Sequence, residues 1–352
     1  MARVDVTIRG AGIFGLSIAW TCVQRGARVR VVDPHGAGSG ASGGIVGALA
    51  PHVPENWNEK KAFQLESLLM AARFWAGIEA AGGQPSGYAR SGRLQPIADT
   101  RALELAQTRA ATARALWGDA AEWRVIDRAE ADRWAPTSVT GRLVQDTLSA
   151  RIHPRMACTA LVAALRAHGT EISRDAPTQD IEIWATGVAG LQELNGRNGR
   201  SVGAGIKGQA ALLRYDAGHL PQIFADGLHV VPHADGTVAI GSTTERDWTD
   251  PTATDTALNP LIDQARAAVP ALAGAPVIER WAGLRPRARS RAPMLGPHPT
   301  KPGQFIANGG FKIGFGMAPK VAQVMADLVL DARDAIPDGF RPDASMPRHQ
   351  GA

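Results

Sequence analysis

The chain has 352 residues, of which 45% are apolar and 20% charged, and its formal net charge is +5. Because this length exceeds the usual size of one domain, two joined domains are expected. The apolar fraction is ordinary for a globular protein, and the spread of Gly and Pro along the chain argues against a long disordered tract. No run of about 18 apolar residues occurs, so no membrane-spanning helix is expected.

The cysteines and the charge limit the location and the partners. Cys22 and Cys158 both fall in predicted helices with apolar neighbours, so no disulfide is expected and a reducing cytoplasm fits best. The start of the chain also lacks the apolar core of a secretory signal. The positive charge comes mostly from scattered arginines, apart from one local run, Arg285, Arg287, Arg289 and Arg291. Without basic clusters interleaved with aromatic residues, nucleic-acid binding is not expected.

The first strand, turn and helix predict a dinucleotide site. An apolar strand over residues 4–8 leads into the turn Gly10-Ala11-Gly12-Ile13-Phe14-Gly15. A helix is expected over residues 16–25, and a second strand over residues 28–32 ends at Asp33. In this pattern the glycines allow a tight turn, a close approach to pyrophosphate and close helix packing, and the acid binds a ribose. Arg9 stands where small residues are usual, so its side chain is expected in solvent or near a phosphate.

The segment after Asp33 favours FAD over NAD. An NAD-dependent dehydrogenase would continue the alternation of strands and helices, whereas small residues fill the chain from Pro34 onward. Such a stretch suggests backbone wrapped around an extended ligand. Residues 40–44 also match G-x-S-x-G, the nucleophile elbow of serine hydrolases, but that motif needs a strand directly before it. Loop-like residues stand there instead, so a hydrolase is not favoured.

These segments resemble the superfamily of D-amino-acid, glycine and sarcosine oxidases. The resemblance rests on the glycine-rich turn, Asp33, and the loop Ala41-Ser42-Gly43 followed by Gly47-Ala48. In that family the loop runs from the pyrophosphate to the isoalloxazine ring, so the resemblance implies FAD. It assigns cofactor contacts to Gly10, Gly12, Ile13, Phe14, Gly15, Asp33, Pro34, Ala41, Ser42, Gly43, Gly47 and Ala48. Since neither cysteine lies in these segments, the FAD is expected to be noncovalent.

The middle of the chain returns to the cofactor once. Helices are expected over residues 62–82, 100–116 and 155–168. A strand over residues 180–184 ends in Ala185-Thr186-Gly187, and in the family this segment meets FAD, which assigns Thr186 and Gly187 to the cofactor. Only residues 169–179 stand before that strand, where the family usually has a small β-meander near the adenine. A more open adenine side is therefore expected.

The next segment alternates as antiparallel strands do, and one face of the resulting sheet is expected to cover the ligand. The strands are expected over residues 209–215, 227–233 and 237–241. His229 and His233 are spaced to share one face of a strand. Pro232 intervenes and no third ligand is evident, so no metal site is expected.

Two blocks near the C-terminus carry the candidate substrate residues. The first contains Gly283-Leu284-Arg285-Pro286 and is expected to precede a strand over residues 305–307. The second is a glycine-rich turn before a helix expected over residues 318–330, and it is assigned to the flavin through Gly309, Gly310, Phe311 and Ile313. In the same superfamily the Gly-Leu-Arg-Pro arginine grips the substrate carboxylate, which implies this role for Arg285. The lysine of Gly-x-Phe-Lys supplies a second cation, which implies Lys312.

An arginine suits a carboxylate because its planar fork binds both oxygens and stays charged. Arg287, Arg289 and Arg291 are expected to be mostly solvated. Residues 1–50, 141–204 and 283–340 are predicted to form an α/β, Rossmann-like FAD-binding domain. It is interleaved with an α+β substrate domain, residues 51–140 and 205–282, which carries the antiparallel sheet. Residues 341–352 are expected to be a flexible tail.

The sequence therefore predicts an FAD-dependent oxidoreductase acting on a small amino acid or secondary amine that bears a carboxylate. A hydride would pass from the substrate Cα to flavin N5, and the imine would be hydrolysed, with O2 or another acceptor reoxidising the flavin. One alternative resembles the oxidase half of a tRNA wobble-uridine modification enzyme, and another is a flavin-binding module without turnover. An NAD-dependent dehydrogenase is disfavoured. Oligomeric state, electron acceptor and side-chain specificity are not predicted.

Overall fold

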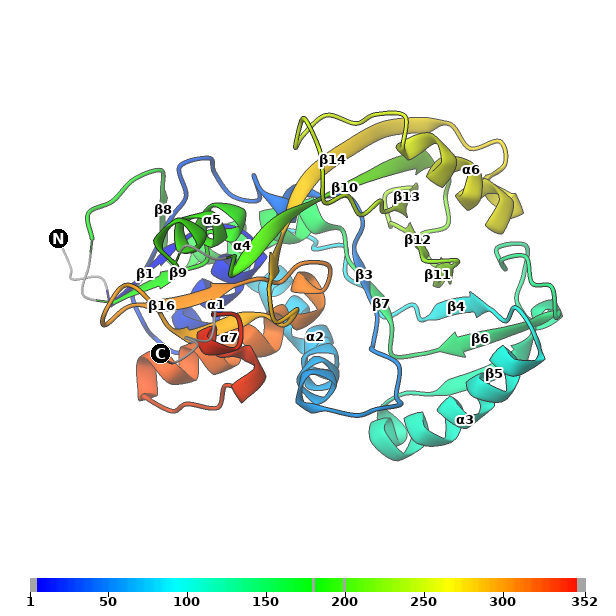
Figure 1. Ribbon diagram of the computed structural model, residues 1–352, viewed down its shortest axis with the longest axis horizontal. Helices are drawn as coiled ribbons and strands as arrows, with labels where there is room; N and C mark the ends of the chain where they lie inside the picture. The colour runs from blue at the N-terminus through cyan, green and yellow to red at the C-terminus, as the bar shows by residue number, and fades with distance from the viewer. Residues whose placement is uncertain (1–4, 179–180, 199–200, 347–352) are drawn as a thin grey trace, which may run out of the picture.

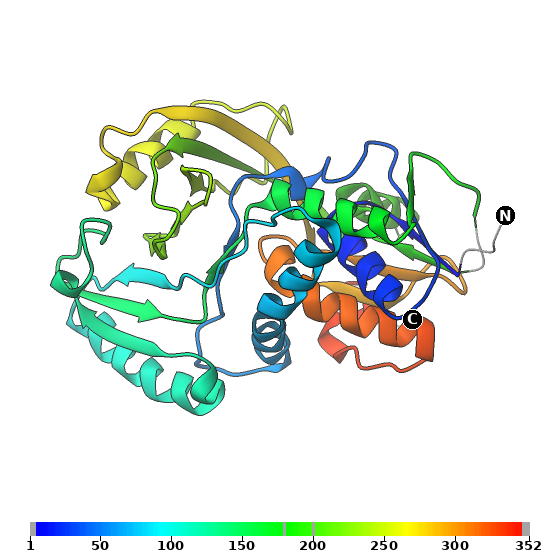
Figure 2. The ribbon, with the colours of Figure 1, turned by 180° about the vertical axis from the view of Figure 1, so that it is seen from behind.

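The computed structural model describes residues 5–178, 181–198 and 201–346, and it arranges them in two halves, each built around one large sheet (Figure 1). A two-stranded ribbon, β3 (Ala48–Leu49) with β7 (Ala150–Arg151), lies between the halves. Figure 2 shows the same division from behind, with helix α2 (Glu59–Gly82) beside the junction. Parallel and antiparallel sheets in one chain confirm the predicted mixed fold class.

The first half contains a six-stranded sheet in the order β15-β16-β9-β1-β2-β8. Its strands are β1 (Val6–Arg9), β2 (Val29–Val32), β8 (Glu171–Ser173), β9 (Glu182–Trp184), β15 (Met294–Pro297) and β16 (Phe305–Asn308). All neighbours pair in parallel except β15 and β16. The connection from β1 leads to β2 on one side while β9 lies on the other, so the topological switch point is between β1 and β9. Ligands bind sheets of this kind at the carboxyl edge of that point.

Helices α1 (Ile13–Gln24), α2, α4 (Pro154–Ala167) and α7 (Gly314–Asp331) pack on one another beside this sheet and form a core with it. Helix α1 packs against α4 and α7, and α2 packs against α4 and α7. The buried faces are apolar, and burial of such faces is the main favourable contribution to folding. Helix α2 begins at Asn58, whose side chain accepts a hydrogen bond from the Lys61 N–H.

The second half contains an eight-stranded sheet in the order β14-β10-β13-β12-β11-β4-β6-β5. Its strands are β4 (Arg93–Pro96), β5 (Trp123–Asp127), β6 (Arg142–Asp146), β10 (Gly203–Arg214), β11 (Gln222–Ala225), β12 (Leu228–Pro232), β13 (Thr237–Gly241) and β14 (Val277–Ala288). The pairing is antiparallel except between β11 and β4. Helix α6 (Leu258–Ala268) covers the apolar outer face, and α3 (Thr100–Trp117) packs against β5. The other face turns toward the first half, where Ile45 and Val46 pack on it.

Strand β10 begins earlier than the strand predicted over residues 209–215, and β14 lies where no strand is predicted. They pair from Gly203 with Ala288 to Leu213 with Val277, so both cross the predicted domain boundaries at residues 204 and 282. The block around Arg285, for which no strand is predicted, is part of β14, and the strand predicted after it over residues 305–307 is present as β16. Pro286 is tolerated since β14 is at the edge of the sheet, where a missing N–H breaks no central ladder. Helix α5 (Gly187–Asn198) packs against both strands.

Some predicted segments differ from the structure at their ends. Val4 and Asp180, which were predicted to begin two strands, lie outside the described residues. Residues 169–179 contain β8, which pairs with β2 and extends the sheet. Strand β6 falls in the segment predicted for cofactor binding but belongs to the eight-stranded sheet. Of the predicted tail, Pro342 and Ser345 are buried, and residues 347–352 lie outside the described part of the chain.

Candidate active site

The glycine-rich turn joins the ends of two strands to the start of α1. Gly10 has a φ of +108°, which favours glycine, and a Cβ there would lie 2.3 Å from the Ala185 carbonyl oxygen. A Cβ on Gly15 would lie 1.9 Å from the Gly10 carbonyl oxygen. The turn therefore packs the helix start against the carboxyl ends of β1 and β9, at the switch point.

The N-terminus of α1 offers donors to an anion. Gly12 is the N-cap and provides no side-chain acceptor, and the Ile13 N–H donates to Ser42 Oγ at 2.9 Å. Among the described residues, the N–H groups of Phe14 and Gly15 have no hydrogen-bond partner. Free N–H groups and the helix dipole together favour a phosphate at this point. Ser42 lies in the short 3-10 helix η1 (Ala41–Gly43), so the predicted loop does reach the helix start.

Asp33 and the segment after β9 lie at the same edge of the sheet as the glycine-rich turn. The Asp33 carboxylate accepts hydrogen bonds from the Ala11 N–H at 2.8 Å and the His35 N–H at 2.9 Å. Each carboxylate oxygen has a further acceptor position, which suits a ribose hydroxyl. Pro34 follows directly, and Thr186 precedes Gly187, which begins α5 with a φ of +58°. These residues fit the adenosine and pyrophosphate parts of FAD.

Arg9 does not serve the phosphates. Its guanidinium forms an ion pair with the fully buried carboxylate of Glu182 at 2.6 Å and lies 5.2 Å from the centre of the Trp184 ring. Glu182 and Trp184 belong to β9, which pairs with β1. Arg9 therefore compensates a buried charge in the sheet, and neither of the two predicted positions is correct.

The predicted flavin-contacting segments meet at the junction of the halves. A Cβ on Gly47, just before Ala48 in β3, would lie 1.8 Å from the Ile152 carbonyl oxygen, so the loop packs tightly there. A Cβ on Gly310 would lie 2.9 Å from Phe14 Cζ. The turn from Gly309 to Ile313, which N-caps α7, is thus held against α1. On its other side the Phe311 N–H donates to the Pro286 carbonyl of β14 at 2.9 Å.

Arg285 is a largely buried cation without an acidic partner. Its Nη1 donates to Ser242 Oγ at 2.6 Å, and its Nη2 donates to the carbonyls of Thr243 at 2.6 Å and Lys207 at 3.2 Å. No carboxylate of the described residues lies within ion-pair distance, and the buried Nε–H has no partner. Burial lowers the pKa of Arg285 to about 10, and Glu245 offsets this only partly. The guanidinium is charged at neutral pH and able to bind an anion.

Glycine makes room for this guanidinium. A Cβ on Gly208 of β10 would lie 1.8 Å from Arg285 Nη2, so the arginine lies directly over the glycine backbone. No local pattern marks Gly208, because it pairs with Gly283 of β14 and lies beneath the Arg285 side chain only through the register of β10 and β14. Ser242 and Thr243, which orient the same side chain, were likewise not predicted.

Lys312 lies near Arg285 but is more exposed. Its Nζ donates to Thr244 Oγ1 at 2.8 Å and lies 5.9 Å from the centre of the Phe311 ring. Partial burial, and then the charge of Arg285, lower the pKa of Lys312. The two predicted cations therefore lie around one aromatic ring, as Arg285 Cζ is 5.7 Å from the same centre.

His229 lies in β12 and His233 directly after it, and the two are not part of a cluster of metal ligands among the described residues. Burial, then the charges of Arg93 and Lys312, lower the pKa of His229 to about 3, and its buried Nδ1 has no partner. His233 instead binds the Ile45 carbonyl through Nε2 at 3.0 Å. Within the described ranges no group of three potential metal ligands occurs. His229 is a neutral imidazole on the face of the sheet that turns toward the junction, since it pairs with Gly241, which contacts Val46.

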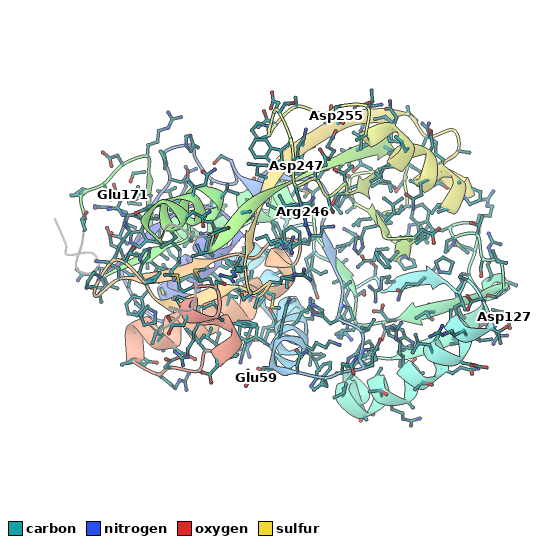
Figure 3. All side chains as sticks on the ribbon, viewed as in Figure 1. Glu59, Asp127, Glu171, Arg246, Asp247 and Asp255 are labelled. Carbon is teal, nitrogen blue, oxygen red and sulfur yellow. The ribbon has the colours of Figure 1, made fainter. Side chains whose placement is uncertain are left out.

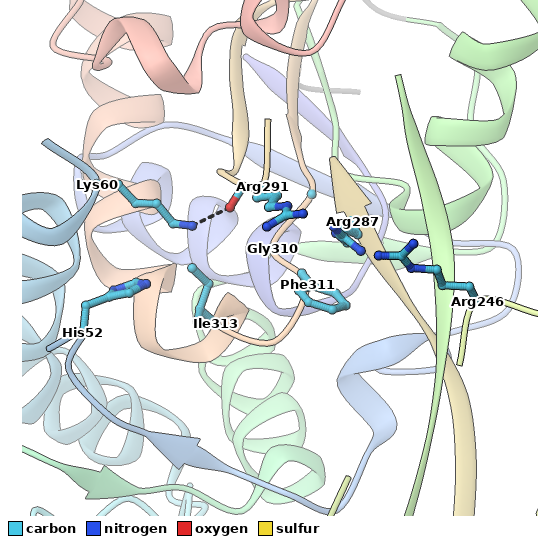
Figure 4. Close-up of a pocket in the computed structure, with 9 residues that line it drawn as sticks. His52, Lys60, Arg246, Arg287, Arg291, Gly310, Phe311 and Ile313 are labelled. Carbon is cyan, nitrogen blue, oxygen red and sulfur yellow. Dashed lines mark hydrogen bonds between the residues drawn. The ribbon is translucent and has the colours of Figure 1, made fainter. Parts of the chain in front are cut away.

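A cavity of about 410 Å³ lies beside the turn after β16 (Figure 4). It is lined by His52, Lys60, Arg246, Arg287, Arg291, Gly309, Gly310, Phe311 and Ile313. The expectation of solvated arginines is wrong for Arg287, which is half-buried, whereas Arg289 and Arg291 are exposed as predicted, although Arg291 also lines this cavity. Arg287 differs from the prediction because the position of its strand in the sheet is not visible in the local sequence.

The comparisons with known proteins identify the family. A family model described as FAD dependent oxidoreductase matches residues 5–328. The chain belongs to this family. FAD is therefore its cofactor class, and the predicted resemblance to the amino-acid oxidase superfamily is confirmed. The tRNA-modifying and non-catalytic alternatives are not favoured by these matches.

Several relatives are glycine oxidases. One from Pseudomonas putida is 34% identical over 143 residues, which cover 40% of this chain and 39% of the relative. The chain thus spans less than half of that relative. One from Bacillus licheniformis is 24% identical, and the alignment covers 93% of each chain.

Solved structures show the same fold. The glycine oxidase from Geobacillus kaustophilus has a TM-score of 0.84 and 22% identity, covering 100% of both chains. The iminodiacetate oxidase from Chelativorans sp. BNC1 has a TM-score of 0.85 and 21% identity, covering 96% of this chain and 98% of that one. None of the described helices combines the length and apolar character that a membrane crossing requires.

Proposed function

We propose that the chain oxidises the C–N bond of a small amino acid or secondary amine that bears a carboxylate. The observation that supports this most is Arg285. It is a cation held by three hydrogen bonds, and among the described residues it has no acid to neutralise it and no partner for its buried Nε–H. An unpaired buried charge is costly, and a substrate carboxylate would compensate it.

The chain's own residues then orient the substrate. FAD, when bound, supplies the chemistry by accepting a hydride from the substrate Cα. Arg285 would bind the carboxylate through its planar fork, and Lys312 would add a second positive charge nearby. His229 would remain neutral and offer a hydrogen bond without repelling the substrate. No obligatory base is assigned, since orientation in a dry site accounts for much of the rate in such reactions.

The predicted cofactor contacts and catalytic roles are part of this proposal. Close contacts of Ile45 and Val46 with Ala210, Leu212 and Trp281 exclude water from part of the junction. Relatives named glycine oxidase, iminodiacetate oxidase and L-proline dehydrogenase support the substrate class, because each named compound joins an amine to a carboxylate. These names belong to those proteins, and the substrate of this chain is open to measurement.

The FAD is proposed to be noncovalent. Burial raises the pKa of both the Cys22 and the Cys158 thiols to about 12, so both are protonated and unreactive at neutral pH. Denatured protein should therefore release all its yellow colour on washing. Retained colour would contradict this part of the proposal.

An absorbance spectrum tests the function directly. Purified protein is expected to show flavin bands, and anaerobic addition of glycine, sarcosine, proline or a D-amino acid should bleach them. If the bands are present and none of these amines bleaches them, the substrate class is wrong while the cofactor stands. A colourless protein that takes up no added FAD would overturn the whole proposal.

A further inference from the structure

The cavity beside Phe311 carries positive charge only. Its charged lining consists of Lys60, Arg246, Arg287 and Arg291, while burial lowers the pKa of His52 and keeps that ring neutral, and no aspartate or glutamate is among the described lining residues. None of these three arginines forms an ion pair with another described residue. A partly enclosed space with several cations and no acid is suited to an anionic ligand.

Two of these arginines converge from different elements. Arg287 lies on β14, and Arg246 lies on the loop after β13, over the junction of the two halves (Figure 3). Figure 4 shows their guanidinium groups pointing toward one another at the side of the cavity. Like charges repel at such positions, so the arrangement is unfavourable until an anion lies between them. Arg287 is half-buried, which reduces screening by solvent, and Arg246 is exposed at the rim.

The cavity is within reach of the carboxylate site proposed above. Arg285 and Arg287 are two residues apart on the same strand, so their side chains leave the same face about 6.6 Å apart. The Cζ atoms of both lie 5.7 Å from the centre of the Phe311 ring. One short molecule can therefore place one anionic group at Arg285 and another at Arg287.

We propose that the substrate is a dicarboxylic amine, whose second carboxylate is bound by Arg287 and Arg246. This inference rests on the proposed function, because it takes the first carboxylate to lie at Arg285. The oxidation itself is unchanged: the electron pair of the Cα–H bond would leave to FAD as a hydride while the nitrogen lone pair forms the C=N bond, and water would hydrolyse this imine to a carbonyl compound and an amine. The second carboxylate takes no part in the reaction and determines which amines are accepted.

The test uses ligands that cannot be oxidised as amines. Diglycolate carries two carboxylates joined through an ether oxygen, and methoxyacetate carries one. Each is titrated into the FAD-loaded protein, and binding is followed by the change in the visible flavin spectrum. Diglycolate is expected to bind at least 10-fold more tightly, since a charge-assisted hydrogen bond is added.

Substitutions of single arginines test which side chain binds the second carboxylate of diglycolate. Arg287→Gln is expected to lower diglycolate affinity on the order of 10- to 100-fold and to change methoxyacetate affinity less than about twofold. Arg289→Gln removes the same charge from an exposed position outside the cavity and should leave both affinities unchanged. Arg246→Gln should give a smaller loss, again for diglycolate alone.

The other outcomes overturn the inference. Equal binding of the two ligands would mean that no second carboxylate is recognised. A loss of FAD from Arg287→Gln without a loss of diglycolate preference would mean that the cation serves the cofactor. Failure of the proposed function is a separate result, because it appears as unbleached flavin in the amine panel whatever the ether ligands do.

Discussion

Replacement of Arg285 by glutamine tests the carboxylate site most directly. Burial lowers the pKa of Arg285 from 12.5 to about 10, and one pKa unit corresponds to about 1.4 kcal/mol. The charged guanidinium is therefore about 3 kcal/mol less stable in this site than in water. A bound carboxylate compensates this cost, and truncating one partner of such a buried charged pair costs about 2–5 kcal/mol. Replacing Arg285 by glutamine is therefore expected to weaken substrate binding by about 3 kcal/mol, or on the order of 100-fold.

The assay is anaerobic flavin reduction measured at rising substrate concentration. Arg285→Gln should raise the apparent dissociation constant about 100-fold, and Arg285→Lys should give an intermediate rise because it keeps the charge but loses the fork. Arg289→Gln, exposed at the end of the same strand, is the matched control and should behave as the wild type. An unchanged dissociation constant for Arg285→Gln, with FAD retained and the protein folded, would refute the assignment.

Three further perturbations follow from the same contacts. Gly208→Ala places a Cβ 1.8 Å from the present position of Arg285 Nη2, so the guanidinium must move. As a result kcat/KM should fall about 10- to 100-fold with FAD retained. An unchanged kcat/KM would contradict the close contact between Gly208 and Arg285. Ser42→Ala removes the acceptor of the Ile13 N–H. FAD affinity, measured by titration of the apoprotein, should fall about fivefold, which corresponds to a loss of about 1 kcal/mol. An unchanged affinity would mean that Ser42 does not contribute to FAD binding. Burial lowers the pKa of His233 to about 4, so the unfolded state binds the proton more readily than the folded state. The free energy of unfolding should therefore decline as pH falls from about 6.5 toward 4. His233→Asn should flatten the dependence of Tm on pH in this window, and an unaltered slope would exclude His233 as its cause.

The cofactor half could be predicted largely from local sequence. The glycine-rich turn, the following helix and Asp33 lie within the first 33 residues, and their geometry depends on contacts between near neighbours. The structure brings Gly10, Ser42 and Asp33 to one edge of the sheet, close to where such motifs place a dinucleotide. The family match confirms the FAD-dependent class.

Arg285 and Lys312 could be named from their motifs, but their surroundings could not. The position of β14 at a sheet edge decides that Arg287 lines a cavity, and no periodicity within the segment reveals its neighbours. Gly208 matters only because the long register of β10 and β14 places it beneath the guanidinium. Arg9 forms its ion pair only because Glu182, 173 residues later in the chain, lies on the adjoining strand.

The sequence by itself therefore determined the motifs that attract a dinucleotide and the residue types that bind a carboxylate, since these depend on short-range backbone geometry and intrinsic charge. Only the tertiary structure decided which charges lack partners. Whether an arginine is solvated, paired or left to bind a ligand depends on strands whose partners are far apart in the chain, 173 residues apart for Arg9 and Glu182. That pairing is set by packing of the whole sheet, which no local pattern encodes.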